Sequence, residues 1–357
     1  MIKKECFTAE WIEQVSSELH YNDKNLIEKV IRALSLLEML VKAGCPLVFK
    51  GGTALMLILG KSAHRLSIDI DLICPPGTNI EDYLKSFADF GFINLELVER
   101  KQRDDADIPK SHSKFFYQIA YRNDTDAQSY ILLDVFYEDI HYFRTQQIAI
   151  NCPFIRLEGK PLMVTVPSAE DILGDKLTAF APNTTGIPYY KNGRSCSMEI
   201  AKQLYDVGRL FENVSDLQIT KEAFRKIAVV ELSYRSFGTD IGQVFNDIRQ
   251  TALCISTRGK AGEGDFDLIQ DGIIRVKSFM YKQRYLIDHA IIDAARAAYL
   301  ATLIEKGINE IESYSNNPAD IKDMVIRPSL PNKLNKLRSN LPEAYYYWAK
   351  TSELLEA

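Results

Sequence analysis

Features that mark secreted, membrane-spanning and zinc-binding proteins are missing from this sequence. The six cysteines are scattered over 357 residues, with no CxxC pair and no His/Cys cluster at zinc-ligand spacing. We therefore expect free thiols in a reducing cytoplasm. Charges interrupt the apolar runs before they reach bilayer-spanning length, and no apolar signal-peptide core follows the first residues. A soluble, cytoplasmic protein without a membrane segment is expected.

Strong charge of one sign, internal repeats and low-complexity tracts are also missing. The formal net charge is −5, with 46% hydrophobic and 25% charged residues, which is ordinary for a globular protein. This mild acidity argues against a general nucleic-acid coat or a membrane-surface protein. It leaves room for a local basic groove, because net charge says little about charge distribution.

Residue patterns predict a small mixed sheet followed by a helical region. We predict helices at 26–41, 53–59 and 80–90, and strands at 46–50, 66–74, 92–99, 114–121 and 130–137, with a polar turn at 123–126. From Pro167 onward, Ser168 is a natural N-cap and helices are predicted to 181 and at 198–211, 221–232, 268–281 and 285–305. Loops are predicted at 183–197, 257–267 and 314–329. We place a boundary near residue 215, between an α+β domain (1–215) and a helical domain (216–357).

The strongest chemical signal is the pair Asp69 and Asp71. Alternate residues of a strand share a face, so the two aspartates would lie together, opposite the apolar residues between them. Two such carboxylates repel each other unless a cation lies between them, and their oxygens can hold one or two Mg²⁺ ions. The alternative is an exposed edge strand with solvated aspartates, because a DxD pattern alone is common.

Two further features support the metal interpretation. Gly51 and Gly52 follow a predicted strand and Thr53 opens the next helix, so backbone N–H groups and a hydroxyl could approach a triphosphate. A simple strand-to-helix turn is the alternative. Asp134 lies in a strand with apolar residues on both faces, where an unpaired charge is costly. It would either complete a three-carboxylate metal site or accept backbone hydrogen bonds at the sheet end.

The ordered motifs resemble those of the AbiEii/AbiGii nucleotidyltransferase toxins. This family belongs to the DNA polymerase β superfamily and occurs in type IV toxin–antitoxin and phage-defence systems. The matching motifs are KGGTAL at 50–55, RLSIDIDL at 65–72, LLDV at 132–135, DKLTA at 175–179 and KQLYDV at 202–207. The resemblance spans most of 47–211, whereas 215–357 matches only in being helical. It implies a polymerase β-like mixed sheet with flanking helices, followed by a helical bundle.

The resemblance also implies roles for individual residues. Asp69 and Asp71 would hold two Mg²⁺ ions, and Asp134 would be the third metal carboxylate, activating the attacking hydroxyl. The catalytic set would be completed by the family's downstream lysine and aspartate, matched here by Lys176 and Asp206. The residues implied in nucleotide binding are Gly51, Gly52, Thr53, Arg65 and Lys176. Serine is frequent in the family where Thr53 stands, and the change keeps the hydroxyl.

The last two motifs leave alternatives open. Lys176 shares a core-facing helical stripe with Ile172 and Phe180, so its partner could be a nucleotide phosphate or a protein carboxylate. Asp206 lies one helical turn after Lys202, where it could form only an exposed salt bridge. The predicted loop at 183–197 lengthens the separation between the two motifs, which leaves the role of Asp206 open. Arg65 could steady a phosphate or pair with a local carboxylate.

Other side chains could contact an acceptor. A basic set could line an acceptor groove or simply be solvated; it consists of Lys110, His112, Lys114, Lys191 and Arg194. The aromatic run at 345–348 could stack on bases, although packing of a C-terminal helix is the alternative that we prefer.

We therefore expect a Mg²⁺-dependent nucleotidyltransferase that moves a nucleoside monophosphate from an NTP to an acceptor hydroxyl. The resemblance favours RNA as acceptor, with the tRNA 3′ end first, and a toxic effect that a cognate antitoxin protein neutralises. Transfer to a protein side chain or a small molecule is one alternative. A non-catalytic nucleotide-binding protein is another, although a pure binder has no need of Asp134.

Overall fold

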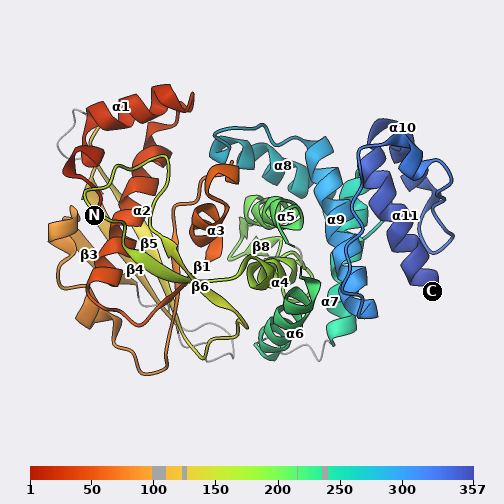
Figure 1. Ribbon diagram of the computed structural model, residues 1–357, viewed down its shortest axis with the longest axis horizontal. Coiled ribbons are helices and arrows are strands. Elements are labelled where there is room, and N and C mark those ends of the chain that lie inside the picture. Colours follow the sequence, from red (N-terminus) through yellow and green to blue (C-terminus); the bar gives the residue numbers. More distant parts are fainter. Residues whose placement is uncertain (99–109, 123–126, 215, 235–239) are drawn as a thin grey trace. The chain divides into compact units, whose positions relative to one another are not determined.

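A computed structural model describes residues 1–98, 110–122, 127–214, 216–234 and 240–357 (Figure 1). The chain forms two compact units, each described here by itself. The first comprises Met1–Ser168 with Ser278–Arg284, and the second Ala169–Lys277 with Tyr285–Ala357. The first carries the large sheet and the second is mostly helical. The α+β class is therefore confirmed.

The division between the units falls at Ser168, not near residue 215. Helices α4 (Ala169–Ala179) and α5 (Ser197–Phe211) pack against later helices, α6 (Leu217–Ser233), α8 (Phe266–Val276) and α9 (Ile287–Lys306). Their apolar faces are therefore buried within the helical unit. The expected division into a nucleotidyltransferase domain (1–215) and a helical domain for acceptor binding or structure (216–357) stays a prediction.

A five-stranded mixed sheet forms the centre of the first unit. Its strand order is β1 (Val48–Lys50), β2 (Ile70–Cys74), β5 (Gln128–Tyr137), β4 (Lys110–Gln118) and β3 (Asn94–Val98). β2 and β5 are parallel, and the other neighbours are antiparallel. The parallel pair lies at the interior of the sheet, where the buried residues are Ile, Leu, Val and one Cys.

Helix α2 (Lys24–Lys42) contacts this sheet through the apolar stripe that the sequence predicts. Asp23 caps it by accepting a hydrogen bond from the backbone N–H of Leu26 at 3.0 Å. The side chains of Val30, Leu34 and Leu37 are fully buried. Each contributes about 1.5–3 kcal/mol relative to an exposed side chain. Helices α1 (Ala9–Glu18) and α3 (Gly51–Leu59) complete this unit's longer helices.

Several predicted elements differ from the structure. The strand predicted at 66–74 begins only at Ile70, because Leu66 instead donates its N–H to the Phe279 carbonyl at 2.8 Å. The helix predicted at 80–90 is two short 3-10 turns, Ile80–Tyr83 and Phe87–Phe90. Residue patterns did not predict the antiparallel pair of β6 (Thr145–Ala149) and β7 (Met163–Pro167). The turn predicted at 123–126 lies outside the described residues.

The second unit is a helical assembly. Besides the helices already described, it contains α7 (Ile241–Ser256), which was not predicted, α10 (Leu337–Asn340) and α11 (Pro342–Glu356). The loop predicted at 183–197 includes a small hairpin of β8 (Tyr190–Lys191) and β9 (Arg194–Ser195). The aromatic run in α11 is buried, and Trp348 donates its Nε1–H to Ser256 at 3.0 Å. Packing is therefore the role of these aromatics, and the base-stacking hypothesis is wrong.

Among the described residues, none of the helices is both long enough and apolar enough to span a bilayer.

Candidate active site

Four polar residues lie in one row across the large sheet. The strand register pairs Lys50 with Asp71, Asp71 with Asp134, and Asp134 with His112. Residues directly opposite each other in a sheet present their side chains on the same face. Two of the three predicted metal carboxylates, Asp71 and Asp134, therefore lie on neighbouring strands about 4.8 Å apart, between a lysine and a histidine.

Asp134 forms a close contact with the imidazole of His112. Its Oδ1 lies 2.5 Å from His112 Nδ1. An ionised carboxylate can only accept, so the Nδ1–H donates this hydrogen bond. His112 is 8% exposed, and its other ring nitrogen, Nε2, is buried without a hydrogen-bond partner. The carboxylate of Asp134 remains 30% exposed, so His112 fixes one oxygen while the group still reaches the surface.

Gly51 holds the helix α3 backbone directly against Asp71. Its φ is +79°, a conformation that side chains other than glycine rarely adopt. A Cβ at this position would lie 2.1 Å from Asp71 Oδ2. At Gly52 a Cβ would lie 2.7 Å from Ser67 Oγ and 3.0 Å from Arg65 Nη2. Both glycines are therefore required for close approach, as expected, but the groups they approach belong to the protein itself.

Thr53 has a different contact from the one expected. Its side chain is fully buried, and its hydroxyl donates to the backbone carbonyl of Asp69 at 2.7 Å. The hydroxyl therefore positions the chain just before β2. Asp69 itself is exposed, immediately ahead of the strand that carries Asp71. The hydroxyl hydrogen is used in the bond to the Asp69 carbonyl, and a role of Thr53 in triphosphate binding stays a prediction.

Arg65 is buried beside this turn. Its Nη1 donates to the Leu66 carbonyl at 3.0 Å, and its backbone forms an isolated bridge with Met280. These contacts connect the segment before the DxD motif to the Ser278–Arg284 part of the same unit. Neither of the predicted roles for Arg65, phosphate contact or carboxylate pairing, is decided by these contacts.

Lys176 and Asp206 form a buried ion pair in the second unit. Lys176 Nζ lies 3.2 Å from Asp206 Oδ2, with side-chain exposures of 9% and 2%. The same ammonium donates to Gln203 Oε1 at 3.0 Å. The partner of this lysine in the structure is thus a protein carboxylate. Because Asp206 is buried, it does not form the exposed salt bridge that was the alternative for it. A removed partner would leave an uncompensated buried charge, which costs about 3–5 kcal/mol.

The first-unit residues fit a divalent ion that a substrate helps to bind. Within the described part of the chain, no three His, Cys, Asp or Glu side chains are grouped closely enough to form a complete metal cluster. Mg²⁺ is commonly held by one or two carboxylates, with substrate phosphates and water supplying the other oxygens. The in-register pair Asp71 and Asp134 matches that requirement. At position 51 only a glycine lets the α3 backbone come this close to the Asp71 carboxylate.

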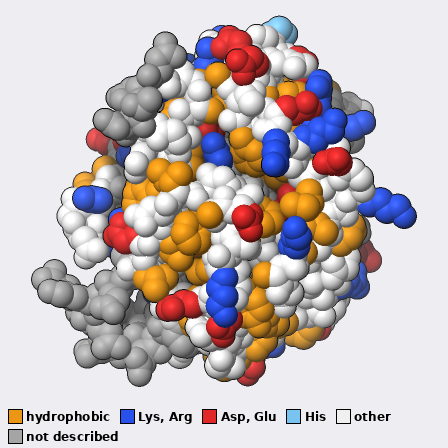
Figure 2. Space-filling view, turned by 90° about the vertical axis from the view of Figure 1, so that its left-hand side faces the viewer, with side chains coloured by type: hydrophobic (Ala, Val, Ile, Leu, Met, Phe, Trp, Pro, Cys, Tyr) orange, Lys and Arg blue, Asp and Glu red, His pale blue; other side chains and the backbone are white. Residues whose placement is uncertain are grey.

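The basic residues considered for an acceptor groove lie in both units. Lys114 pairs with Glu96 at 3.3 Å, and the Lys110 ammonium lies 5.6 Å from the ring centre of Phe136. Lys191 and Arg194 are exposed on the β8–β9 hairpin. On the face drawn in Figure 2, Lys and Arg side chains lie among acidic and hydrophobic ones. The groove stays a prediction.

A family model decides the classification. Residues 34–319 match the model described as "Nucleotidyl transferase AbiEii toxin, Type IV TA system". The chain belongs to this family. It is therefore a nucleotidyltransferase toxin of a type IV toxin–antitoxin system, and the resemblance seen in the motifs is confirmed. No curated protein matches the sequence.

Two solved structures show low similarity to this AbiEii family member. JHP933 from Helicobacter pylori shares 15% identity at a TM-score of 0.40, covering 86% of this chain and 95% of that one. MenT4, a nucleotidyltransferase toxin from Mycobacterium tuberculosis, shares 13% identity at a TM-score of 0.41, covering 82% and 89%.

Proposed function

We propose that this AbiEii toxin transfers a nucleoside monophosphate from an NTP to a hydroxyl of RNA, with the tRNA 3′ end as acceptor. The observation that carries the proposal is the in-register pair Asp71 and Asp134, with Gly51 against one carboxylate and His112 against the other. A non-catalytic nucleotide binder gains nothing from two carboxylates held side by side in the interior strands of a sheet.

The reaction forms one P–O bond and breaks another. The acceptor oxygen bonds to the α-phosphorus of the NTP, and the bond between that phosphorus and the bridging oxygen of pyrophosphate breaks. Mg²⁺ ions held by Asp71 and Asp134, with Asp69 as the further carboxylate that the family resemblance implies, would neutralise charge on the triphosphate and lower the pKa of the attacking hydroxyl. Pyrophosphate leaves with the electron pair of the broken bond.

The chain's own groups orient the acceptor and take its proton. His112 donates to Oδ1 of Asp134, so the second oxygen of this carboxylate is left to face the acceptor hydroxyl. Asp134 is therefore the group that we propose to hold the proton released by that hydroxyl. Gly51 keeps the start of helix α3 close to Asp71, and Gly52 keeps it close to Ser67 and Arg65, so that backbone N–H groups of this turn would bind the triphosphate.

Lys176 and Asp206 contribute as a pair in this proposal. Asp206 holds the lysine ammonium, which would donate to a phosphate of the NTP with its remaining hydrogen. Arg65 would support the backbone beside the DxD motif through its hydrogen bond to the Leu66 carbonyl. The cognate antitoxin would limit this activity in the cytoplasm.

Transfer of an α-phosphate label identifies the acceptor directly. Purified protein is incubated with Mg²⁺, each [α-³²P]NTP in turn, total bacterial RNA and total bacterial protein. Label in tRNA with wild type, and none with the Asp71→Asn or Asp134→Asn variant, is the expected result. Label in protein would reject the RNA acceptor, and NTP binding without any transfer would reject the transferase activity under these conditions.

A further inference from the structure

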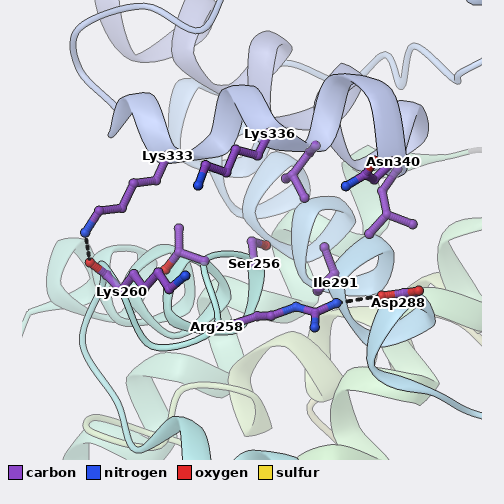
Figure 3. Close-up of a pocket in the computed structure, with 11 residues that line it drawn as sticks. Ser256, Arg258, Lys260, Asp288, Ile291, Lys333, Lys336 and Asn340 are labelled. Atoms are coloured by element: carbon purple, nitrogen blue, oxygen red, sulfur yellow. Dashed lines mark hydrogen bonds and ion pairs between the residues drawn. The ribbon is translucent and has the colours of Figure 1, made fainter.

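A basic pocket in the second unit is not used by the proposed chemistry. It has a volume of about 500 Å³, within the usual size of ligand sites. One wall is the turn that follows α7, with Arg258 and Lys260. The facing wall is the segment that leads into α10, with Lys333 and Lys336 (Figure 3). We call these residues and the space between them the basic pocket.

The lining has a strong excess of positive charge. Four cations and a single carboxylate, Asp288, contribute to it, although the whole chain carries a net charge of −5. Arg258 Nη2 pairs with Asp288 Oδ1 at 3.0 Å. The structure gives Lys260 and Lys336 no ion-pair partner among the described residues. An uncompensated cluster of this kind attracts anions.

The turn that presents these cations is fixed by its own hydrogen bonds. Arg258 has φ +54°, a left-handed conformation that costs a non-glycine residue about 1–2 kcal/mol. The hydroxyl of Thr257 accepts from the N–H of Ala261 and donates to the carbonyl of Leu253, at 2.9 and 2.8 Å. Lys333 Nζ donates to the Lys260 carbonyl at 2.5 Å and joins the two walls. The pocket is therefore preformed.

The position of the charges favours a chain of phosphates over a single enclosed nucleotide. The lysines and Arg258 are exposed at the rim, whereas Ser256, Ile291 and Leu337 are buried at the floor. A triphosphate held inside would need cations at the floor, where these side chains lie. Rim ammonium groups would instead meet phosphates that pass across the opening, as in the backbone of an RNA strand.

We infer that the basic pocket binds backbone phosphates of the RNA acceptor, an inference that rests on the proposed function. It is tested by the affinity of the full-length protein for labelled tRNA without NTP, over a range of salt concentrations. The test variant is Lys260→Gln/Lys336→Gln. The matched control is Lys306→Gln/Lys322→Gln, which removes the same charge from exposed lysines outside the lining. Thermal unfolding confirms that both variants are folded.

The pocket variant is expected to bind tRNA about tenfold more weakly, with a slope of log affinity against log salt smaller by about 1–2. The control is expected to match wild type. Equal affinity and slope for both variants would overturn the inference. Loss of labelled-ATP binding in the pocket variant would also overturn it, in favour of an enclosed nucleotide. Normal tRNA binding with loss of antitoxin binding would assign the pocket to that protein instead.

The label-transfer experiment separates this inference from the proposed function. If wild type labels tRNA while the pocket variant binds and labels tRNA normally, the transferase function stands and the pocket inference fails. If wild type binds tRNA through the pocket but labels protein, the RNA-acceptor function fails. Asp71→Asn is expected to lose labelling and to retain tRNA binding, because Asp71 lies in the other unit.

Discussion

At the scale of single residues, the contact between His112 and Asp134 is the feature that sequence reasoning did not find. His112 was considered only as a groove residue. In the structure it is buried and lies 2.5 Å from the carboxylate expected to activate the acceptor. We class it as a positioning residue, because it acts through Asp134.

Replacing His112 with Leu or Asn separates this positioning role from packing. Asn keeps a donor near the place of Nδ1, whereas Leu fills similar space without one. Losing a hydrogen bond to a charged group costs about 1.5–3 kcal/mol, so His112→Leu is expected to lower kcat about 10- to 100-fold. His112→Asn is expected to keep most of the wild-type kcat. Steady-state kinetics measures kcat, and thermal unfolding checks that both variants are folded. Equal kcat for both variants would reject the positioning role.

Gly51 offers a second residue-scale prediction with a matched control. Gly51→Ala and Gly44→Ala both place an alanine at positive φ, +79° and +75°. The left-handed backbone alone is expected to cost each variant about 1 kcal/mol of stability, and the collision at Gly51 adds to that cost. Only at Gly51 would the new Cβ collide with Asp71. Gly51→Ala alone is therefore expected to lose most transferase activity, measured as label incorporation at equal folded concentration. A comparable loss of transferase activity in both variants would show that the collision with Asp71 is not the cause.

At the scale of elements, the spacing of apolar residues predicted those helices and strands that are determined by local packing. The α2 stripe, the helices α4, α5 and α9, and the existence of the β4–β5 pair all follow from residue patterns. The start of β2 does not, because Leu66 pairs with Phe279, more than two hundred positions away. The row Asp71–Asp134–His112 depends on strand register, and a shift of one residue would change every partner. Sequence reasoning could name the aspartates but not the histidine.

The pair Lys176 and Asp206 shows the same limit. The stripe through Ile172 and Phe180 predicted that the lysine faces the core, and both of these neighbours are buried. The predicted loop at 183–197 left the pairing with Asp206 open. That segment contains the short β8–β9 hairpin and connects α4 to α5 in the chain. The ion pair joins these two helices, with Lys176 Nζ 3.2 Å from Asp206 Oδ2.

The contact between α5 and α9 gives a pH-dependence prediction. Asp293 on α9 is buried against the α5 backbone, where a Cβ at Gly208 would lie 2.0 Å from its Oδ1. Burial raises the pKa of Asp293 to about 6 from 3.8, although Arg209 and Arg296 oppose the shift. Between about pH 4 and 6 the folded protein therefore binds more protons than the unfolded chain. The free energy of unfolding falls as pH rises through this window, by at most about 3 kcal/mol from this group.

Asp293→Asn removes this contribution. Urea unfolding at several pH values from 4 to 7 is expected to show a smaller decrease in the free energy of unfolding than in wild type. Burial also raises the pKa of Asp247, Glu28 and Glu38, but these groups are present in both proteins and cancel in the difference. Identical pH slopes for variant and wild type would contradict the assignment.

At the scale of the whole molecule, the residues that we propose for function lie in both compact units. The first holds Asp71 and Asp134 in register on parallel strands, and the second holds the Lys176–Asp206 pair and the basic pocket. The mildly acidic net charge gives no sign of that pocket, because the charge excess is local. Composition thus predicted an ordinary globular protein. The ordered motifs predicted the nucleotidyltransferase toxin family, which the family model confirms.

The central claim is that Asp71 and Asp134 act together in nucleotidyl transfer to RNA. The most direct measurement compares label transfer from [α-³²P]NTP to total RNA for wild type, Asp71→Asn and Asp134→Asn in Mg²⁺. Wild type is expected to label tRNA, and each variant to lose about 100-fold or more of the rate while remaining folded. Label entering RNA at the wild-type rate with either variant would contradict the account.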